Sequence, residues 1–600
     1  MGKDHSDLHT HSRVLFRRPP HRAGRLGSVD PNLRSLHLDH LNNIARLEAL
    51  HPRPARIAAN HRPHAGLLAL RPPAFWLRHQ AIPLDTLGRT ALVLMADPSG
   101  LPALRAGLTD HFDDLIPVPT ASAAIEESLT RQFSAEMTRA ASASVPPDLS
   151  CRSFDYARAR APAVALLGMG ILAAILAPAA TMVLLMGLAL LTLVLFTGLR
   201  LTGLAAAAQA GHQARSAGKQ SAPAHSAPTI SVLVPLYREA EIGRHLLRRL
   251  CRLTYPRARM EVLLVLEEGD EITRAAVASA HLPDWFRVVE VPRDGPLTTK
   301  PRAMNYALNY CRGDIIGIWD AEDAPEPDQL DKVASAFDSA APEVACLQGV
   351  LDYYNPSRNW IARCFTLEYS GWFRVLLQGI ARLHLVVPLG GTTLFIRREA
   401  LEALGAWDAH NVTEDADLGV RLARAGFRTE MLDTATYEEA NSRILPWIKQ
   451  RSRWLKGFMM TYLVHMRAPR RLLRDLGLAR FLGFQAFFLG TLGQFLLAPI
   501  LWSFWLVLLG LPHPADAVLS RAVLVPLAST LMIFEALNIC IWICGAYAGL
   551  RPRLALWAPM MPLYFVMGCF AAYKALWEVF AAPFFWDKTS HGAHGGTGDG

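Results

Sequence analysis

Two long apolar stretches divide the chain. The first covers 161–199 and has no charged residue before Arg200, and the second covers 476–585. Since about 20 apolar residues cross a bilayer as a helix, the first stretch predicts a transmembrane hairpin that turns near Pro178. The second predicts four spans, two of them meeting near Pro499, with three spans as the alternative. An even number of spans in the second stretch would keep the polar regions before and after that stretch on one side of the membrane.

Between these stretches, strand patterns alternate with helix patterns. We expect strands at 230–236, 261–266, 285–291 and 314–319 and helices at 239–253 and 303–311. Such alternation is typical of an α/β fold with a doubly wound, mostly parallel sheet, in which ligands bind beyond the carboxyl ends of the strands. The sequence therefore predicts an α/β domain over 229–460, and a linker rich in Ala, Ser, Lys and Gln at 212–228 joins it to the hairpin.

A smaller α/β pattern precedes the hairpin. Residues 1–60 are basic and are predicted to form a weakly ordered lead-in, whose beginning lacks the apolar core of a signal peptide. Strands are expected at 91–96 and 116–119, followed by a helix from Ser122 through Phe133. The sequence thus predicts a small α/β module over 61–150.

Composition narrows the class of protein. Of the 600 residues, 51% are hydrophobic, and the formal net charge is +9. The basic residues are spread around the membrane segments, and no stretch interleaves basic with aromatic side chains as a nucleic-acid surface does. The eight cysteines include no CxxC pair, which argues against a zinc site or a disulfide framework and favours a cytoplasmic location for the polar parts. We therefore expect a lipid bilayer, and no nucleic acid, as a partner.

Carboxylates follow the fourth predicted strand. Asp320 and Glu322 would project to the same side of an extended chain and offer hard oxygens to Mg²⁺ or Mn²⁺. A metal ion there would neutralise charge on a departing diphosphate. Lys300, near the start of a predicted helix, could add a phosphate contact. The alternatives are a polar turn before Pro325 and a solvated lysine.

Further acidic residues follow the first two predicted strands. Glu239 comes after the first strand, and Glu267 and Glu268 end the second. A carboxylate at a strand end can accept a hydrogen bond from a nucleobase N–H or a ribose hydroxyl, so these residues are candidate donor-binding groups. Acidic residues in this position are also common as solvated turn residues.

Asp415 is the candidate catalytic base. It follows Glu414 at the start of a predicted helix, and a carboxylate beside bound substrate can take a proton from an acceptor hydroxyl. The alternative is a capping pair between Asn411 and Glu414, which would explain these two residues but not Asp415.

Three residues of a later helix share one face. Gln450, Arg453 and Trp454 stand at positions i, i+3 and i+4. The indole offers a stacking platform for a sugar ring, and the other two side chains can bond hydroxyls or phosphate. An amphipathic helix whose basic residues face lipid headgroups is the alternative, and both interpretations can hold together.

The order of these motifs resembles that of a known family. The segments PLYRE, EEGD, KPRAMN, DAED, GGTTLF, TED and QRSRW, over about 230–460, look like those of a processive family 2 glycosyltransferase of the cellulose synthase and hyaluronan synthase type. The resemblance implies a GT-A fold and inverting transfer from a UDP-sugar. It also implies a metal at Asp320 and Glu322, with Asp320 near the donor, and Asp415 as base. The family usually has aspartates where this chain has Glu267 and Glu268.

The resemblance also assigns the acceptor side. Gln450, Arg453 and Trp454 would bind the nascent chain and the diphosphate, and Glu414 would lie beside the acceptor. The C-terminal segment FFWDKTSHG, within 584–600, is similar to an element that closes over the donor in these enzymes. An aromatic belt at the membrane interface is the alternative for that segment.

The N-terminal module carries a second resemblance. Its segments ADPSG and VPTASAAIEESLTRQF are similar to the N-terminal domain of type II secretion ATPases. This resemblance implies a regulatory or docking role, through which the module would meet a secretion or regulatory partner.

Taken together, the resemblances imply a multi-pass hexosyltransferase of the bacterial inner membrane with a cytoplasmic catalytic domain. It would polymerise a hexose, glucose from UDP-glucose above all, into a β-linked exopolysaccharide. A non-processive transferase acting on a lipid acceptor is the second interpretation. A membrane receptor or scaffold with a degenerate transferase domain is the third.

Overall fold

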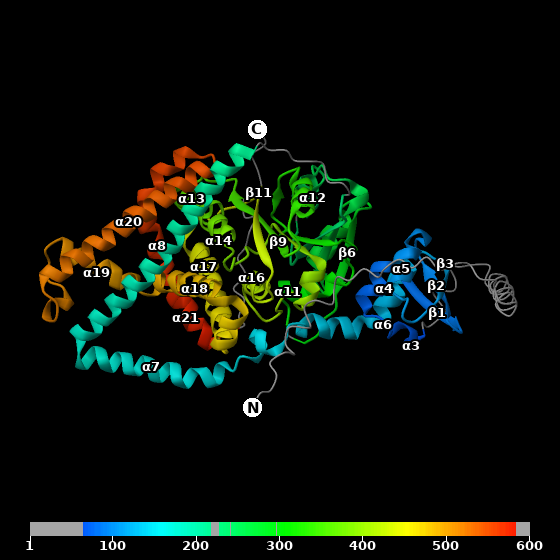
Figure 1. The fold of residues 1–600 in the computed structure, drawn as a ribbon, viewed down its shortest axis with the longest axis horizontal. Coiled ribbons are helices and arrows are strands. Elements are labelled where there is room, and N and C mark those ends of the chain that lie inside the picture. The colour runs from blue at the N-terminus through cyan, green and yellow to red at the C-terminus, as the bar shows by residue number, and fades with distance from the viewer. Residues whose placement is uncertain (1–63, 218–226, 241, 296, 584–600) are drawn as a thin grey trace, which may run out of the picture.

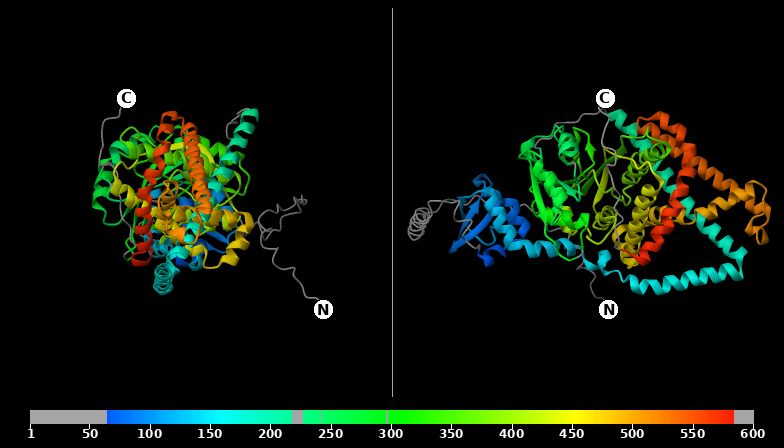
Figure 2. Two further views of the ribbon diagram at one scale, coloured as in Figure 1. Left: turned by 90° about the vertical axis from the view of Figure 1, so that its left-hand side faces the viewer. Right: turned by 180° about the vertical axis from the view of Figure 1, so that it is seen from behind.

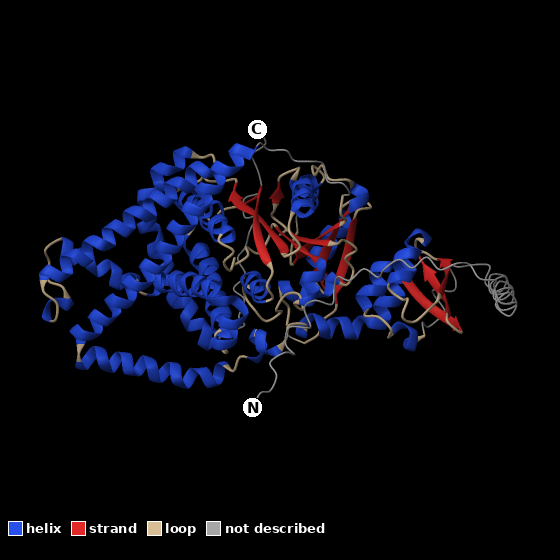
Figure 3. Ribbon diagram, in the orientation of Figure 1, coloured by secondary structure: helices blue, strands red, loops and turns tan. Residues whose placement is uncertain are grey.

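The structure is a computed structural model that describes residues 64–217, 227–240, 242–295 and 297–583. Three parts follow one another along its longest axis, and Figure 1 shows them from right to left. The N-terminal module (64–143) comes first, the central domain (227–443) lies in the middle, and long helices form a bundle at the other end. Figure 3 shows that strands occur in the first two parts and that the third is helical.

The N-terminal module is a three-stranded sheet covered by helices. Its elements are α3 (Ala65–Leu68), α4 (Pro73–His79), β1 (Ala81–Leu87), β2 (Thr90–Met95), α5 (Leu101–Ala106), β3 (Asp114–Pro119) and α6 (Ser122–Ala143). β2 and β3 lie where the sequence predicts strands and pair in parallel, whereas β1 pairs antiparallel with β2. The alternation pattern does not predict β1, because Pro83 and Asp85 interrupt it at an irregular register. α6 continues ten residues beyond its predicted end at Phe133.

The central domain contains one eight-stranded sheet in the order β6-β5-β4-β7-β10-β9-β11-β8. Its strands are β4 (Ile230–Leu236), β5 (Met260–Glu267), β6 (Phe286–Val291), β7 (Ile315–Ile318), β8 (Ala324–Pro325), β9 (Val344–Tyr353), β10 (Leu394–Arg397) and β11 (Arg428–Glu438). Its helices are α9 (Ile242–Leu250), α10 (Glu271–Ser279), α11 (Lys300–Leu308), α12 (Gln329–Ser339), α13 (Trp360–Gly371), α14 (Gln378–Arg382), α15 (Arg398–Ala403) and α16 (Glu414–Arg424).

The sheet is mixed, which corrects the expectation of a mostly parallel one. β6, β5, β4 and β7 are parallel, as the alternating strands and helices predict. β10 then runs antiparallel to both of its neighbours, β7 and β9. The reason is the route of the chain: a helical excursion through α13 and α14 separates β9 from β10 and returns the chain in the opposite direction. If β10 ran parallel to β9, the chain would need a crossover connection in place of this excursion.

Two helices form the expected hairpin. α7 (Tyr156–Leu176) and α8 (Pro178–Ala217) meet at Ala177, with Pro178 as the first residue of α8. The parts long and apolar enough to cross a membrane are Arg158–Leu176 and Pro178–Gln209. Figures 1 and 2 show α7 diverging from α8 beyond this turn, and none of the residues in the apolar part of α7 is buried.

The remaining long helices are C-terminal. They are α17 (Ile444–His465), α18 (Pro469–Leu496), α19 (Ala498–Leu508), α20 (Arg521–Ala548) and α21 (Met561–Ala581), the last preceded by a 3₁₀ segment at Pro552–Met560. Within the described C-terminal residues, three segments are long and apolar enough to span: Pro469–Leu496, Arg521–Ala548 and Pro552–Ala581. α19 is apolar but has only 11 residues, too few to cross alone. By length, the structure therefore matches the alternative of three spans rather than four.

Candidate active site

The chain turns sharply after β7. The Asp323 N–H donates to the Asp320 carbonyl over 3.1 Å, and the Asp323 carboxylate accepts from the Asp320 N–H over 2.8 Å and from the Thr392 hydroxyl. The segment is therefore a tight turn, and the prediction of an extended chain that projects Asp320 and Glu322 to one side is wrong. Both residues nevertheless line one cavity.

Asp415 lies in the first turn of α16 and faces the loop before β10. Its carboxylate accepts hydrogen bonds from the Gly391 N–H and, over 2.8 Å, from the Ala416 N–H. The proposed capping pair is not formed: Thr413 is the N-cap residue, and Asn411 bonds the Thr413 N–H and the Thr461 hydroxyl instead. Capping thus does not account for the acidic pair.

Lys300 connects the two acidic segments. Its ammonium lies 2.5 Å from an Asp320 oxygen and donates to the Gly391 carbonyl over 2.9 Å. Since the Gly391 N–H binds Asp415, a single glycine joins the lysine to the candidate base. Lys300 opens α11, where Thr299 caps the helix by accepting from the Arg302 N–H.

Burial and mutual repulsion change the ionisation of this cluster. Burial, together with the charge of Asp415, raises the pKa of Glu414 to about 8, while Lys300 opposes the change. Burial also raises the pKa of Asp415, against the stabilising N–H groups of Gly391 and Ala416 and the charge of Lys300. For Lys300, burial acts to lower the pKa, but the neighbouring Asp320 and Glu414 raise it overall. A lysine that stays charged among carboxylates suits a site for an anionic substrate.

The acidic end can accept a divalent cation. No group of three or more His, Cys, Asp or Glu side chains with metal-binding geometry occurs among the described residues. Mg²⁺ commonly takes one or two protein carboxylates and completes its shell with water and substrate phosphates. Asp320 and Glu322 fit that requirement, and the buried Asp323 has an oxygen, Oδ1, without a partner in the described chain. These carboxylate oxygens therefore fit the expected Mg²⁺ or Mn²⁺ ion, which the protein and the substrate would bind together.

α17 supplies the second wall of the site. Gln450 lines the cavity, and its side-chain oxygen accepts a hydrogen bond from Asn441 over 2.8 Å. The Arg451 guanidinium lies 4.8 Å from the Trp454 ring centre and 5.0 Å from that of Trp447, and it binds Glu368 over 2.6 Å. This packing holds the Trp454 indole in place. Arg451 and Glu368 were missed by the sequence analysis, since their partnership joins helices far apart in the chain.

A single cavity of about 690 Å³ joins these walls. It is lined by eight of the predicted site residues: Lys300, Asp320, Glu322, Glu414, Asp415, Gln450, Arg453 and Trp454. The same cavity continues between the long helices, where Arg200, Trp502, Asn538 and Trp542 line it. The site is therefore open toward the candidate membrane region as well as the sheet edge.

Three predicted donor-binding residues lie outside the wall of this cavity. Glu267 pairs with Arg302 over 3.3 Å, and burial raises its pKa to about 7. Glu268 accepts from the Arg293 N–H over 2.7 Å, and the Glu239 N–H donates to Thr273. Their role in binding the nucleotide stays a prediction. The FFWDKTSHG segment lies outside the described residues.

Glu438 is a further lining residue that sequence reasoning missed. It ends β11, and burial raises its pKa well above the usual range, with Asp323 and Glu322 adding to the effect. The available signal was a strand-like segment that ends in two glutamates, the same pattern that made Glu267 and Glu268 candidates.

Two family models match separate parts of this chain. Residues 227–457 match the model of "Glycosyltransferase like family 2", and residues 54–139 match that of the MshEN domain. The chain is 29% identical over 249 residues to a β-monoglucosyldiacylglycerol synthase of Synechocystis, covering 40% of this chain and 50% of the relative. It is 27% identical over 238 residues to a probable glucomannan 4-β-mannosyltransferase of Arabidopsis thaliana, covering 38% and 43%.

Among solved structures, mannosyltransferase PcManGT from Pyrobaculum calidifontis, in complex with GDP-Man and Mn²⁺, is 23% identical with a TM-score of 0.42, over 66% of this chain and 99% of the other. The chain spans about half the length of the curated relatives it matches. The comparisons support a family 2 glycosyltransferase domain related to glucosyl- and mannosyltransferases. The narrower expectation of a cellulose or hyaluronan synthase type is not confirmed by them.

Proposed function

We propose that this protein is a membrane-embedded, inverting glycosyltransferase that polymerises a hexose, most simply glucose from UDP-glucose, into a β-linked polysaccharide. The observation that carries the proposal is the single cavity, which runs from Asp320 and Asp415 past Trp454 to Arg200 between the long helices. A chain extended at the acidic end has a continuous path toward the candidate membrane region. The catalytic domain faces the cytoplasm of a bacterial inner membrane in this proposal.

Asp415 acts as the base. It accepts the proton of the acceptor hydroxyl as that oxygen attacks the sugar carbon from the side opposite the departing diphosphate. Gly391 and Lys300 hold the carboxylate in position. A divalent ion held by Asp320, Glu322 and the substrate would neutralise charge on the diphosphate when bound.

The acceptor end rests on α17. Trp454 offers a ring face on which a sugar can stack, and Gln450 and Arg453 offer donors for its hydroxyls or for phosphate. Glu414 lies beside the base at the same wall. The next residues along the cavity belong to the long helices, so each added sugar displaces the chain toward the membrane.

The test uses Asp415→Asn protein in membranes, supplied with UDP-glucose and Mg²⁺. Loss of the base should reduce polymer formation by at least about 100-fold, while UDP binding persists because the fold and the Lys300 contact remain. Asp433→Asn, an exposed substitution on β11, is the matched control and should keep full activity. Unchanged synthesis by Asp415→Asn would remove the proposed base.

Transfer to a lipid acceptor is the second candidate, since several relatives are named as β-monoglucosyldiacylglycerol synthases. The length of the product separates the two: a polymerase forms material that migrates as a ladder or smear on a gel, whereas a one-step enzyme forms a single glycolipid. A scaffold without activity would release no UDP.

A further inference from the structure

Helix α6 of the N-terminal module lies against the central domain. Figure 1 shows it extending from the module toward α11, and side-chain contacts fasten it to the central domain. The Thr130 and Tyr310 hydroxyls are 2.8 Å apart, and Glu126 pairs with Arg287 of β6 over 2.7 Å. All four side chains are at least partly buried. The module is thus attached to the domain that carries the candidate site.

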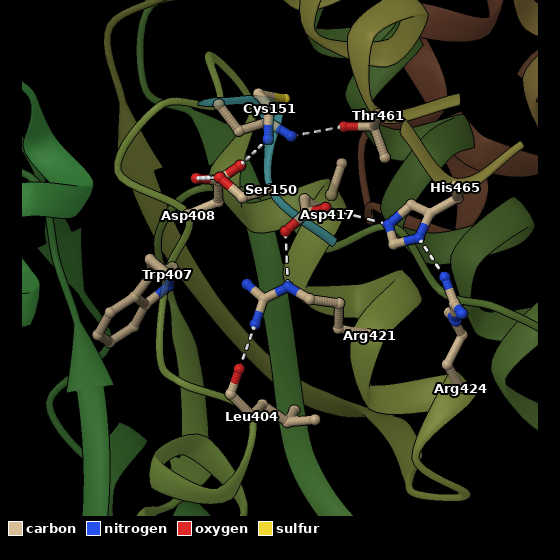
Figure 4. Close-up of polar contacts among 12 residues, drawn as sticks. Ser150, Cys151, Leu404, Trp407, Asp408, Asp417, Arg421, Arg424, Thr461 and His465 are labelled. Carbon is tan, nitrogen blue, oxygen red and sulfur yellow. Dashed lines mark hydrogen bonds and ion pairs between the residues drawn. The ribbon is translucent and has the colours of Figure 1, made fainter. Parts of the chain in front are cut away.

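Beyond α6, the chain reaches the loop that precedes the candidate base. Asp408 is 1% exposed, and its two oxygens accept from the Ser150 hydroxyl over 2.8 Å and from the Cys151 N–H over 2.7 Å (Figure 4). A buried carboxylate is costly unless it is hydrogen-bonded. Asp408 therefore depends on the segment that follows α6 for much of its stabilisation.

The same loop is bound to the helix of Lys300. Asn305 of α11 donates to the Trp407 carbonyl over 2.7 Å and accepts from the Trp407 N–H over 3.0 Å. It also donates to the Ala141 carbonyl, near the end of α6, over 2.9 Å. The Thr299 hydroxyl, just before Lys300, donates to the Ala409 carbonyl over 2.9 Å. One buried amide thus connects α6, α11 and the loop.

The far side of the base is anchored separately. Asp417, two residues after Asp415, is fully buried and binds His465 of α17 over 3.0 Å and Arg421 over 2.7 Å (Figure 4). α16 is therefore fixed to α17 on one side, while the loop before it is held by α6 and the turn at 150–153. The two anchors are thus Asp408 before the base and Asp417 after it. A shift of the turn at 150–153 acts on the residues between them, which include Asp415.

We propose that α6 and the turn at 150–153 form a strut by which the N-terminal module sets the placement of Asp415 relative to Lys300, and so the rate of transfer. Asp408 is a positioning residue in this arrangement, because it holds the loop but does not line the cavity. Binding of a regulator to the module would act on the transferase through this strut. The inference rests on the proposed function, since it takes Asp415 as the base.

The first test is a double-mutant cycle in the full-length protein in membranes, with nucleotide release as the assay. Ser150→Ala and Asp408→Asn should each lower kcat about tenfold with donor KM within about twofold, since small displacements of a base reduce the rate without loosening the donor. The double variant should be no slower than the slower single variant, because both break one contact. Ser150→Thr, which keeps the hydroxyl, should restore most of the rate.

Arg131→Ala is the matched control, because Arg131 lies on the exposed face of α6 and pairs only with nearby Glu127 among the described contacts. It should leave kcat unchanged. Wild-type kcat in Ser150→Ala and Asp408→Asn, or additive losses in the double variant, would overturn the strut.

Hydrogen exchange gives a readout that does not require turnover. Ser150→Ala should speed exchange in 404–416 and leave α12 as in the wild type, since α12 lies on another part of the sheet. A wild-type protein that releases no nucleotide would contradict the proposed function. In that case the hydrogen-exchange measurement alone would test whether the strut holds the loop. Unchanged exchange in 404–416 would overturn the inference.

Discussion

Lys300 determines the charge balance of the candidate site at the scale of single residues. It is the cation between Asp320 and the Gly391 carbonyl, and the Gly391 N–H in turn binds Asp415. Its charge lowers the pKa of both Glu414 and Asp415, against the burial that raises them. A base must be ionised to accept a proton, so the lysine extends activity toward lower pH.

Lys300→Met should therefore move the acidic limb of the pH–rate profile to higher pH. With the cation gone, the acidic pair protonates at a higher pH, and the fraction of ionised Asp415 at neutral pH falls. We expect at least about a tenfold loss of kcat near pH 7, partly recovered in more alkaline buffer. Nucleotide release measured across pH checks this.

Lys332→Met is the control for loss of a lysine, because Lys332 pairs with Glu326 and Asp328 in α12 and its neighbourhood, away from the cavity wall. It should keep the wild-type profile. An acidic limb that stays in place in Lys300→Met would show that the lysine does not tune the base.

At the scale of elements, glycines set how closely helices pack. A Cβ atom at Gly379 of α14 would overlap the backbone of Gly203 in α8, and one at Gly371 would overlap the Trp542 ring of α20. Small residues that let backbones approach are typical of helix contacts in membranes. These contacts join α8 and α20 to the central domain.

Gly379→Ala should destabilise the protein by about 1–3 kcal/mol, because the added methyl forces α8 away from α14. Gly187→Ala in α8 is the matched control, since a Cβ there would meet no atom within 4 Å beyond the backbone of its own helix. It should be neutral or slightly stabilising, as alanine favours the helix. Thermal unfolding in detergent compares the two, and equal midpoints would refute the packing argument.

At the scale of the whole molecule, the cavity determines which product is possible. It passes from the sheet edge to α18, α19 and α20, so a polymer and a lipid would use its inner end differently. A polymer must travel through it, whereas a lipid headgroup need only enter it.

Ala498→Trp places an indole in the inner end of the cavity, where Ala498 is 7% exposed and lines the wall. If the product passes through, long polymer should fall at least about tenfold while short products persist, because the transfer groups are untouched. Leu508→Trp, on the exposed side of the same helix, is the control and should keep the wild-type product. Gel analysis of radiolabelled product distinguishes them, and unaltered long polymer in Ala498→Trp would exclude this path.

The local sequence pattern alone determines several elements of this protein and one face of its candidate site. The hairpin turn at Pro178, the strand at 230–236 and the shared face of Gln450, Arg453 and Trp454 all follow from residues within a few positions of one another. Such features depend on backbone period and on proline geometry, which the neighbouring sequence already contains.

Tertiary structure decided the rest. The antiparallel direction of β10, the bond from Gly391 to Asp415 and the contact of Ser150 with Asp408 join residues separated by long stretches of chain. Sequence periodicity indicates which face of an element is buried, but not which distant element covers it. That choice depends on how the whole core packs, because only the closed fold shows which buried polar groups find partners.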